Sequence, residues 1–200
     1  MLSLEYGKMS FDGGGADLSE YFDGPIIADG TEGSWKNTML KFPALEMQGN
    51  DCYRMFRTCP VKEIDCSLFD TSNVSRFSEM FSGCTSLETL NISSFDFSKV
   101  TGLSSSSTIA SMFLQCDKLT NLTFGVNLGK GFASAAGQSR CTLTLSDCTL
   151  LTHDSLMSVI NNLYDISDKN TQKLVLGDTN LAKLTQEEIA IATNKGWTVS

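Results

Sequence analysis

Residues 69–92 read FDTSNVSRFSEMFSGCTSLETLNI, and residues 95–124 read FDFSKVTGLSSSSTIASMFLQCDKLTNLTF, a second version of the same pattern. The Phe-Asp starts of the two stretches lie 26 residues apart, whereas their Met-Phe-x-x-Cys parts lie 32 apart. The six additional residues fall in a serine-rich insertion. A third, weaker copy carries its Met-Phe-x-x-Cys part at Met55, so the chain contains three repeats of about 25 residues.

Each repeat changes its hydrophobic period halfway along. Val74, Phe77 and Met80 recur at helical spacing, which predicts a short helix. Leu87 and Leu90 then open a Leu-x-x-Leu-x-Leu pattern whose last two apolar residues alternate as in a strand. A unit this small cannot bury its apolar face alone, but stacked units share a continuous core. The pattern therefore predicts an α/β leucine-rich-repeat solenoid, with one short helix and one short strand per repeat.

The cysteines of the Met-Phe-x-x-Cys motif admit a metal-binding, disulfide or packing role. Seven cysteines form no C-x-x-C pair, and a single histidine leaves no Cys/His cluster. Stacked side chains also point the same way, which does not suit a disulfide. We therefore predict a column of buried cysteines. The predicted repeat core consists of Met55, Phe56, Cys59, Met80, Phe81, Cys84, Leu87, Leu90, Ile92, Met112, Phe113, Cys116, Leu119 and Leu122.

The C-terminal part is predicted to continue the stack with longer helices. Leu143 and Leu145 predict a strand that is repeated 31 residues later around Leu174. Cys148 takes the last position of the leucine-rich-repeat signature, where Asn or Cys is usual.

Helix ends are readable in the same region. Thr152 is a suitable N-cap for a helix with an apolar stripe. Thr185 and Glu188 predict a capping box, and Gly196 predicts the end of that helix before a last strand, WTV. Such longer and more polar helices suit a terminal cap, which solenoids need at an exposed end.

The chain is predicted to form one continuous domain. We expect an irregular, Gly- and Asp-rich N-terminal cap, then the repeats, an insertion, and the C-terminal repeats with their cap. The corresponding residues are 1–45, 46–125, 126–140 and 141–200.

Composition narrows the classes of partner. A net charge of −8 repels phosphate backbones, so no nucleic-acid partner is expected. No apolar stretch approaches the roughly 20 residues that span a bilayer, so no membrane insertion is expected. The first residues lack a basic region followed by an apolar one, so we expect either that the chain is cytosolic when made or that its export signal lies outside this sequence.

No catalytic residue, cofactor or metal ligand is predicted. His153 is followed by Asp154 and Ser155, but successive helical residues point apart and do not build a triad. We expect His153 to be a solvated or capping residue. The DGGGAD stretch at residues 12–17 lacks a phosphate-loop lysine and an EF-hand spacing, and is expected to form turns.

The stretch FDTSNVSRFSEMFSGCTSLETLNISSFD resembles the BspA-type leucine-rich-repeat family, whose repeats carry the same Phe-Asp start and Met-Phe-x-x-Cys motif. The ending, from LTHDSLMSVINNLYD to IATNKGWTV, is similar to the closing segments of members from gut bacteria and their phages. The resemblance implies a surface-exposed, non-enzymatic binding protein of the adhesin type.

The first functional hypothesis is therefore a recognition module that binds protein or glycan at a bacterial cell surface, alone or within a larger parent assembly. The alternative is a virion component of a phage tail or fibre. An enzyme is the least favoured class, because no coherent set of catalytic residues is visible. The sequence does not predict the binding surface or the ligand.

Overall fold

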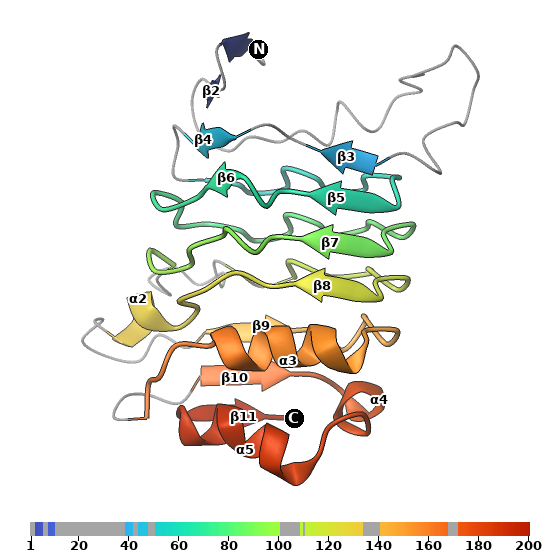
Figure 1. The fold of residues 1–200 in the computed structure, drawn as a ribbon, viewed down its shortest axis with the longest axis vertical. Coiled ribbons are helices and arrows are strands. Elements are labelled where there is room, and N and C mark those ends of the chain that lie inside the picture. Colours follow the sequence, from blue (N-terminus) through green and yellow to red (C-terminus); the bar gives the residue numbers. More distant parts are fainter. Residues whose placement is uncertain are drawn as a thin grey trace.

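A computed structural model describes residues 3–5, 8–10, 39–41, 44–47, 51–100, 109, 111–133, 141–167 and 172–200. The DGGGAD stretch and the serine tract 104–107 lie outside them. The described residues form a mixed α/β fold with short strands and few helices (Figure 1). In chain order the elements are β1 (Ser3–Glu5), β2 (Lys8–Ser10), β3 (Met39–Lys41), β4 (Leu45–Met47), β5 (Glu63–Asp65), β6 (Phe69–Asp70), β7 (Thr89–Asn91), β8 (Asn121–Thr123), α2 (Lys130–Ala133), β9 (Thr142–Thr144), α3 (His153–Asn162), β10 (Gln172–Val175), α4 (Asp178–Leu181), α5 (Gln186–Asn194) and β11 (Trp197–Val199).

The strands of successive repeats stack in one parallel sheet, ordered β3-β5-β7-β8. Figure 1 shows these strands one below another along the long axis of the molecule. Their central residues are in register, with Leu40 beside Ile64, Ile64 beside Leu90, and Leu90 beside Leu122. The side chains of Ile64, Leu90 and Leu122 are buried. Because side chains alternate along a strand, the flanking residues of each strand point outward.

Phenylalanine rings stack in the same direction behind the sheet. Phe81 lies between Phe56 and Phe113, with ring centroids 5.5 Å and 6.1 Å away and nearly parallel planes. A second stacked pair joins Phe69 to Phe95 at 6.2 Å. The aromatic residues thus repeat with the chain and fill a core that is continuous from one repeat to the next.

The prediction of a short helix within each repeat is wrong. Between β6 and β7 the chain forms successive turns, in which Val74, Met80 and Cys84 each donate their N–H to the carbonyl three residues earlier. Glu79 (φ 56°) and Gly83 (φ 77°) adopt left-handed backbone conformations that interrupt any helix. Turns spaced three or four residues apart bury the same positions as a helix, so the hydrophobic period does not separate them.

Backbone groups that a helix would use internally are bonded to the next repeat instead. We call residues 54–59, 79–84 and 111–116 the Met-Phe-x-x-Cys segments. Phe56 N–H donates to the carbonyl of Met80 (2.8 Å), and Phe81 N–H donates to that of Met112 (3.0 Å). These bonds hold the Met-Phe-x-x-Cys segments side by side, as the strands are held in the sheet.

The C-terminal part departs from a simple continuation of this sheet. The strand predicted around Leu143 and Leu145 forms as β9, but it pairs with β10 and opens a second parallel sheet, β11-β10-β9. Helix α3 instead follows β8 in the stack, and β9 to β11 lie behind α3 and α5 in the view of Figure 1. In this second sheet, Leu143 and Leu174 lie in register.

Serine hydroxyls on α3 take the place of the missing strand. Leu122 N–H donates to Ser155 Oγ, and Phe124 N–H donates to Ser158 Oγ, both at 2.9 Å. The outer edge of β8 therefore pairs with side chains of a helix.

The predicted helix ends are confirmed. Thr152 caps α3 by accepting the N–H of Ser155, and Thr185 and Glu188 form a reciprocal capping box at the start of α5. Gly196 follows α5 with φ 85°, a left-handed conformation that favours glycine. The WTV segment then forms strand β11, paired with β10.

Near the N-terminal end, β1, β2, β4 and β6 form a third sheet. Strand β1 runs antiparallel to β2, and β4 runs parallel to both β2 and β6. Among the described residues, none of the three sheets closes into a barrel.

Candidate functional site

The outward side of the β3-β5-β7-β8 sheet, here called the sheet face, presents two rows of side chains in fixed register. The row at the start of the strands and the row at their ends are two residues apart on each strand, which places them on the same side. The strands β3 and β8 at either edge have the most exposed outward residues. The sheet face consists of Met39, Lys41, Glu63, Asp65, Thr89, Asn91, Asn121 and Thr123.

Charge is concentrated on one half of the sheet face. Lys41 Nζ lies 3.8 Å from an Asp65 carboxylate oxygen. Hydrogen bonds from Ser67 lower the pKa of Asp65, with Lys41 as a smaller contribution. Just before the strands, Lys62 pairs with Glu88 at 2.8 Å. These exposed pairs add little stability, but they fix where positive and negative groups lie.

The other half of the sheet face is uncharged. Strands β7 and β8 place Thr89 beside Asn121 and Asn91 beside Thr123. The four side chains provide hydroxyl and amide groups that both donate and accept hydrogen bonds. A rigid surface with closely spaced, neutral hydrogen-bonding groups suits a ligand that is itself rich in hydroxyl groups.

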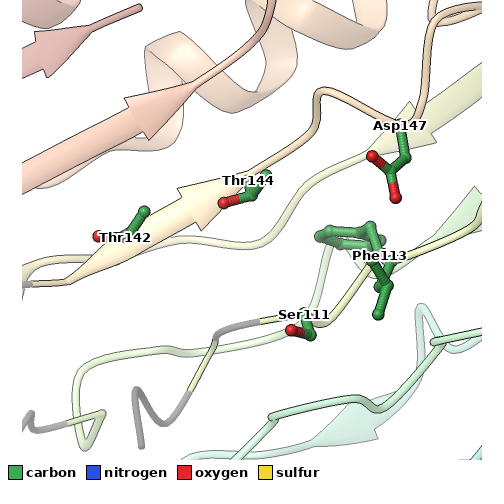
Figure 2. A pocket seen from close by; sticks show the side chains of 6 residues that line it. Ser111, Phe113, Thr142, Thr144 and Asp147 are labelled. Carbon is green, nitrogen blue, oxygen red and sulfur yellow. The ribbon is translucent and has the colours of Figure 1, made fainter.

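A pocket of about 140 Å³ lies elsewhere, between the third Met-Phe-x-x-Cys segment and strand β9. Figure 2 shows Thr142 and Thr144 on β9, with Ser111 and Phe113 on the facing segment and Asp147 beyond the strand end. The residues that line it are Ser111, Phe113, Leu114, Thr142, Thr144 and Asp147.

The residues predicted to form the repeat core are all buried, and each exposes at most 3% of its own surface. The thiol of Cys84 donates to the carbonyl of Phe56 (3.0 Å), and that of Cys116 donates to the carbonyl of Phe81 (3.1 Å). Cys148 extends this column with a longer contact of 3.7 Å to the carbonyl of Phe113.

Burial makes these thiols poor nucleophiles. It raises the pKa of Cys59 to about 11 and that of Cys141 to about 12. It also raises the pKa values of Cys84 and Cys116. Since the thiolate is the reactive form, the column has a packing role at neutral pH.

His153 lies on the surface at the start of α3. Its Nε2 lies 2.7 Å from Glu188 Oε1, and its Nδ1 lies 3.4 Å from Asp154 Oδ1. Hydrogen bonds to Glu188 and then Asp154 raise the pKa of His153. The side chain of Ser155 points away from this pair and lies against β8. This contact links α3 to α5, and no hydroxyl group of the described residues forms a hydrogen bond with the imidazole.

Three buried or half-buried polar residues were missed by the sequence reasoning. Ser155 and Ser158 bond the edge of β8, as described above. Asn180 is fully buried, and its amide donates to the carbonyls of Leu145, Cys148 and Leu176. A polar residue on an otherwise apolar helical stripe was the available signal, because it requires a hydrogen-bond partner inside the fold.

The described residues contain neither a cluster of metal-binding side chains nor a membrane-spanning helix. No three His, Cys, Asp or Glu side chains among them gather in a way that could hold a metal ion. No helix within the described ranges has the length and apolar character needed to cross a bilayer.

Comparison with known proteins gives one family match. Residues 50–134 match the model of a family described as "Mycoplasma protein of unknown function, DUF285". The match spans the three Met-Phe-x-x-Cys segments and strands β5 to β8. Searches of curated proteins and of solved structures found no match.

Proposed function

We propose that this chain is a leucine-rich-repeat solenoid of the BspA type that acts as a non-enzymatic recognition module at a bacterial cell surface. The sheet face is its binding surface, and a glycan is the ligand that the chemistry of this face favours over a protein. The observation that carries the proposal is the outward row of neutral side chains held in register by β7 and β8.

The stacked arrangement supports the solenoid part of this proposal. Three repeats contribute one strand each to the parallel sheet, and their Met-Phe-x-x-Cys segments bond to one another on the far side of the core. Repeats that contact only their neighbours create an extended surface, which repeat proteins use for binding.

The preference for a glycan follows from the residue types. The central parts of protein–protein interfaces are enriched in aromatic residues, Met and Arg. Apart from Met39 at one edge, the sheet face carries none of these. Its Thr and Asn side chains instead match the donors and acceptors of sugar hydroxyl groups.

A glycan array with purified protein tests this proposal. A defined subset of the arrayed glycans should bind the wild-type protein. The double variant Asn121→Ala, Thr123→Lys should lose this binding. Both positions are exposed, so the fold should persist. Thr198→Lys, at an exposed strand position of the second sheet, is the matched control and should bind normally.

Two outcomes would reject the proposal. One is that the wild-type protein binds no arrayed glycan more strongly than an unrelated acidic protein does, and that it also fails to bind intact bacterial or host cells. The other is that the sheet-face variant and the Thr198→Lys control lose binding equally, because this would locate the ligand elsewhere.

A further inference from the structure

The pocket described above lies where the hydrogen bonding between successive segments is interrupted. Gly83 N–H donates to the carbonyl of Leu114 (2.8 Å), and Leu145 N–H donates to that of Val175 (2.8 Å). Within the described part of the chain, however, no main-chain hydrogen bond joins residues 111–115 to residues 142–147. The two segments meet at one end only, which leaves the other end open as a pocket.

Asp147 closes the joined end of this pocket. Its Oδ2 accepts the N–H of Gln115 at 3.0 Å, and Ser146 Oγ lies 3.4 Å from its Oδ1. No lysine, arginine or histidine nitrogen of the described residues lies within 4 Å of this carboxylate. Asp147 is thus half-buried, and its carboxyl group has no cationic partner among the described residues.

The other lining residues combine apolar surface with hydroxyl oxygens. Phe113 and Leu114 supply carbon atoms, and 44% of Leu114 is exposed. Ser111, Thr142 and Thr144 supply hydroxyl groups. A ligand that satisfies both would have an apolar stem and a positively charged end with several hydrogen-bond donors.

We propose that this pocket binds the primary ammonium group of a lysine side chain presented by a protein partner. An ammonium group has three donors and matches a carboxylate surrounded by hydroxyl oxygens. A cavity of about 150 Å³ holds the six carbons of benzene. The four methylenes and one nitrogen of a lysine side chain therefore suit the 140 Å³ found here.

Arginine fits this pocket less well. A guanidinium group binds a carboxylate best when both oxygens accept from it in parallel. Here Oδ2 of Asp147 is already engaged by the Gln115 N–H. The site should therefore discriminate lysine from arginine, as well as charged from neutral side chains. It is independent of the glycan proposal, since β9 belongs to the other sheet.

Titration of the ¹⁵N-labelled chain by NMR tests the proposal. The probes are Nα-acetyl-lysine amide, Nα-acetyl-arginine amide and Nα-acetyl-norleucine amide, a neutral analogue with the four carbons of the lysine side chain but no ammonium group. We expect the lysine compound to shift the amide signals of Thr142, Thr144 and Gln115, and to bind about fivefold more tightly than either other probe.

Three variants make the test specific. Asp147→Asn retains an oxygen that can accept the Gln115 N–H but removes the charge, so it should abolish the preference for lysine. Thr144→Leu fills the pocket from the surface and should reduce lysine binding without changing charge. Asp117→Asn, at a nearby exposed carboxylate, is the matched control and should bind lysine as the wild type does.

Equal binding of the three probes, or shifts that spread over the whole surface, would overturn the proposal. So would an equal loss of binding in Asp117→Asn and Asp147→Asn, because that result indicates general attraction to an acidic protein. Circular dichroism of each variant establishes that it is folded before these results are compared.

Discussion

In the second and third Met-Phe-x-x-Cys segments, the cysteine is held by the segment before it. Cys84 and Cys116 each donate a thiol hydrogen bond to the carbonyl of the phenylalanine in the preceding repeat. A cysteine is small enough for this position, mostly apolar and still able to satisfy a buried carbonyl. The motif thus specifies a contact between repeats.

Thiol labelling checks this assignment. All seven cysteines are buried, and their pKa values are raised by burial, so Ellman's reagent at pH 8 should label them only after denaturation. Rapid labelling of Cys59, Cys84 or Cys116 in the folded protein would contradict the packing role.

A second prediction concerns Cys84→Ser. The serine hydroxyl retains the carbonyl of Phe56 as an acceptor, so the variant should lose only about 1 kcal/mol of unfolding free energy. Urea denaturation measures this loss. A loss above roughly 3 kcal/mol would mean that the hydroxyl is buried without a partner.

The residue before each of these cysteines has a left-handed backbone. Thr58, Gly83 and Gln115 have φ values of 58°, 77° and 60°. A Cβ atom added at Gly83 would lie 3.0 Å from Thr58 Cγ2 in the neighbouring repeat. Strain and steric contact therefore coincide at Gly83.

Gly83→Ala is expected to cost about 1–2 kcal/mol of stability, because alanine is disfavoured at positive φ. Thr58→Ser removes the methyl group that the new Cβ would meet, so in that background the cost should be smaller by roughly 0.5 kcal/mol or more. A double-mutant cycle in urea measures the difference. Identical costs in both backgrounds would show that the neighbouring repeat does not constrain this position.

At the scale of elements, α3 replaces a strand beside β8. Ser155→Ala should leave the N–H of Leu122 without its acceptor and cost about 1–3 kcal/mol. Hydrogen exchange measured by NMR should become faster at Leu122 but not at Phe124. Ser158→Ala should have the reverse effect, since its hydroxyl accepts the N–H of Phe124. Uniform acceleration in both variants would contradict these separate roles.

The contact between α3 and α5 should depend on pH through His153 and Glu188. The pKa of His153 is raised above its ordinary value of 6.5, so its stabilising contribution is complete below pH 6.5 and is lost as pH rises through the raised value. Hydrogen bonds from Thr185 and then His153 lower the pKa of Glu188 below 4.5. Its contribution is present above pH 4.5 and is lost at more acidic pH.

Both contributions are therefore complete between about pH 4.5 and 6.5. The stability difference between wild type and His153→Gln should be larger at pH 5.5 than at pH 8.5, as measured by urea denaturation at the two pH values. A difference that does not change between them would show that the imidazole contacts Glu188 without an ionic contribution.

At the scale of the whole molecule, each repeat contacts the repeats beside it. A destabilising substitution in one repeat should therefore affect the neighbouring repeats most. Phe69→Leu removes a ring that stacks on Phe95. It should accelerate hydrogen exchange at Ile64 and Leu90 and leave Leu174, on strand β10, nearly unchanged. Equal acceleration at all three amides would indicate a single cooperative unit.

The sequence predicted the elements that depend on local patterns. Leu87 and Leu90 indicated the strand that forms as β7, and the caps at Thr152 and Thr185 lie where local sequence placed them. The prediction of helices within the repeats was wrong because Glu79 and Gly83 adopt left-handed conformations, which end any helix. The buried residues nevertheless keep the spacing of a helix. The spacing of apolar residues indicates which side of a segment is buried, but it does not determine the backbone conformation.

The candidate sites could not be predicted in the same way. The pocket joins Ser111 to Thr142 only because the second sheet begins at β9, and no local pattern indicates that change. Likewise, the pairing of Asn91 with Thr123 depends on the register between repeats that differ in length by the serine-rich insertion.

The position of α3 against β8 also bears on self-association. A parallel sheet that grows by one strand per repeat would otherwise end in a row of free N–H and C=O groups, onto which a second molecule could add its own strand. The hydroxyls of Ser155 and Ser158 occupy that row, and the helix that carries them has no strand edge to offer. The switch from strand to helix after the third repeat thus leaves β8 without a free strand edge on this side, which is the feature that edge-to-edge association requires.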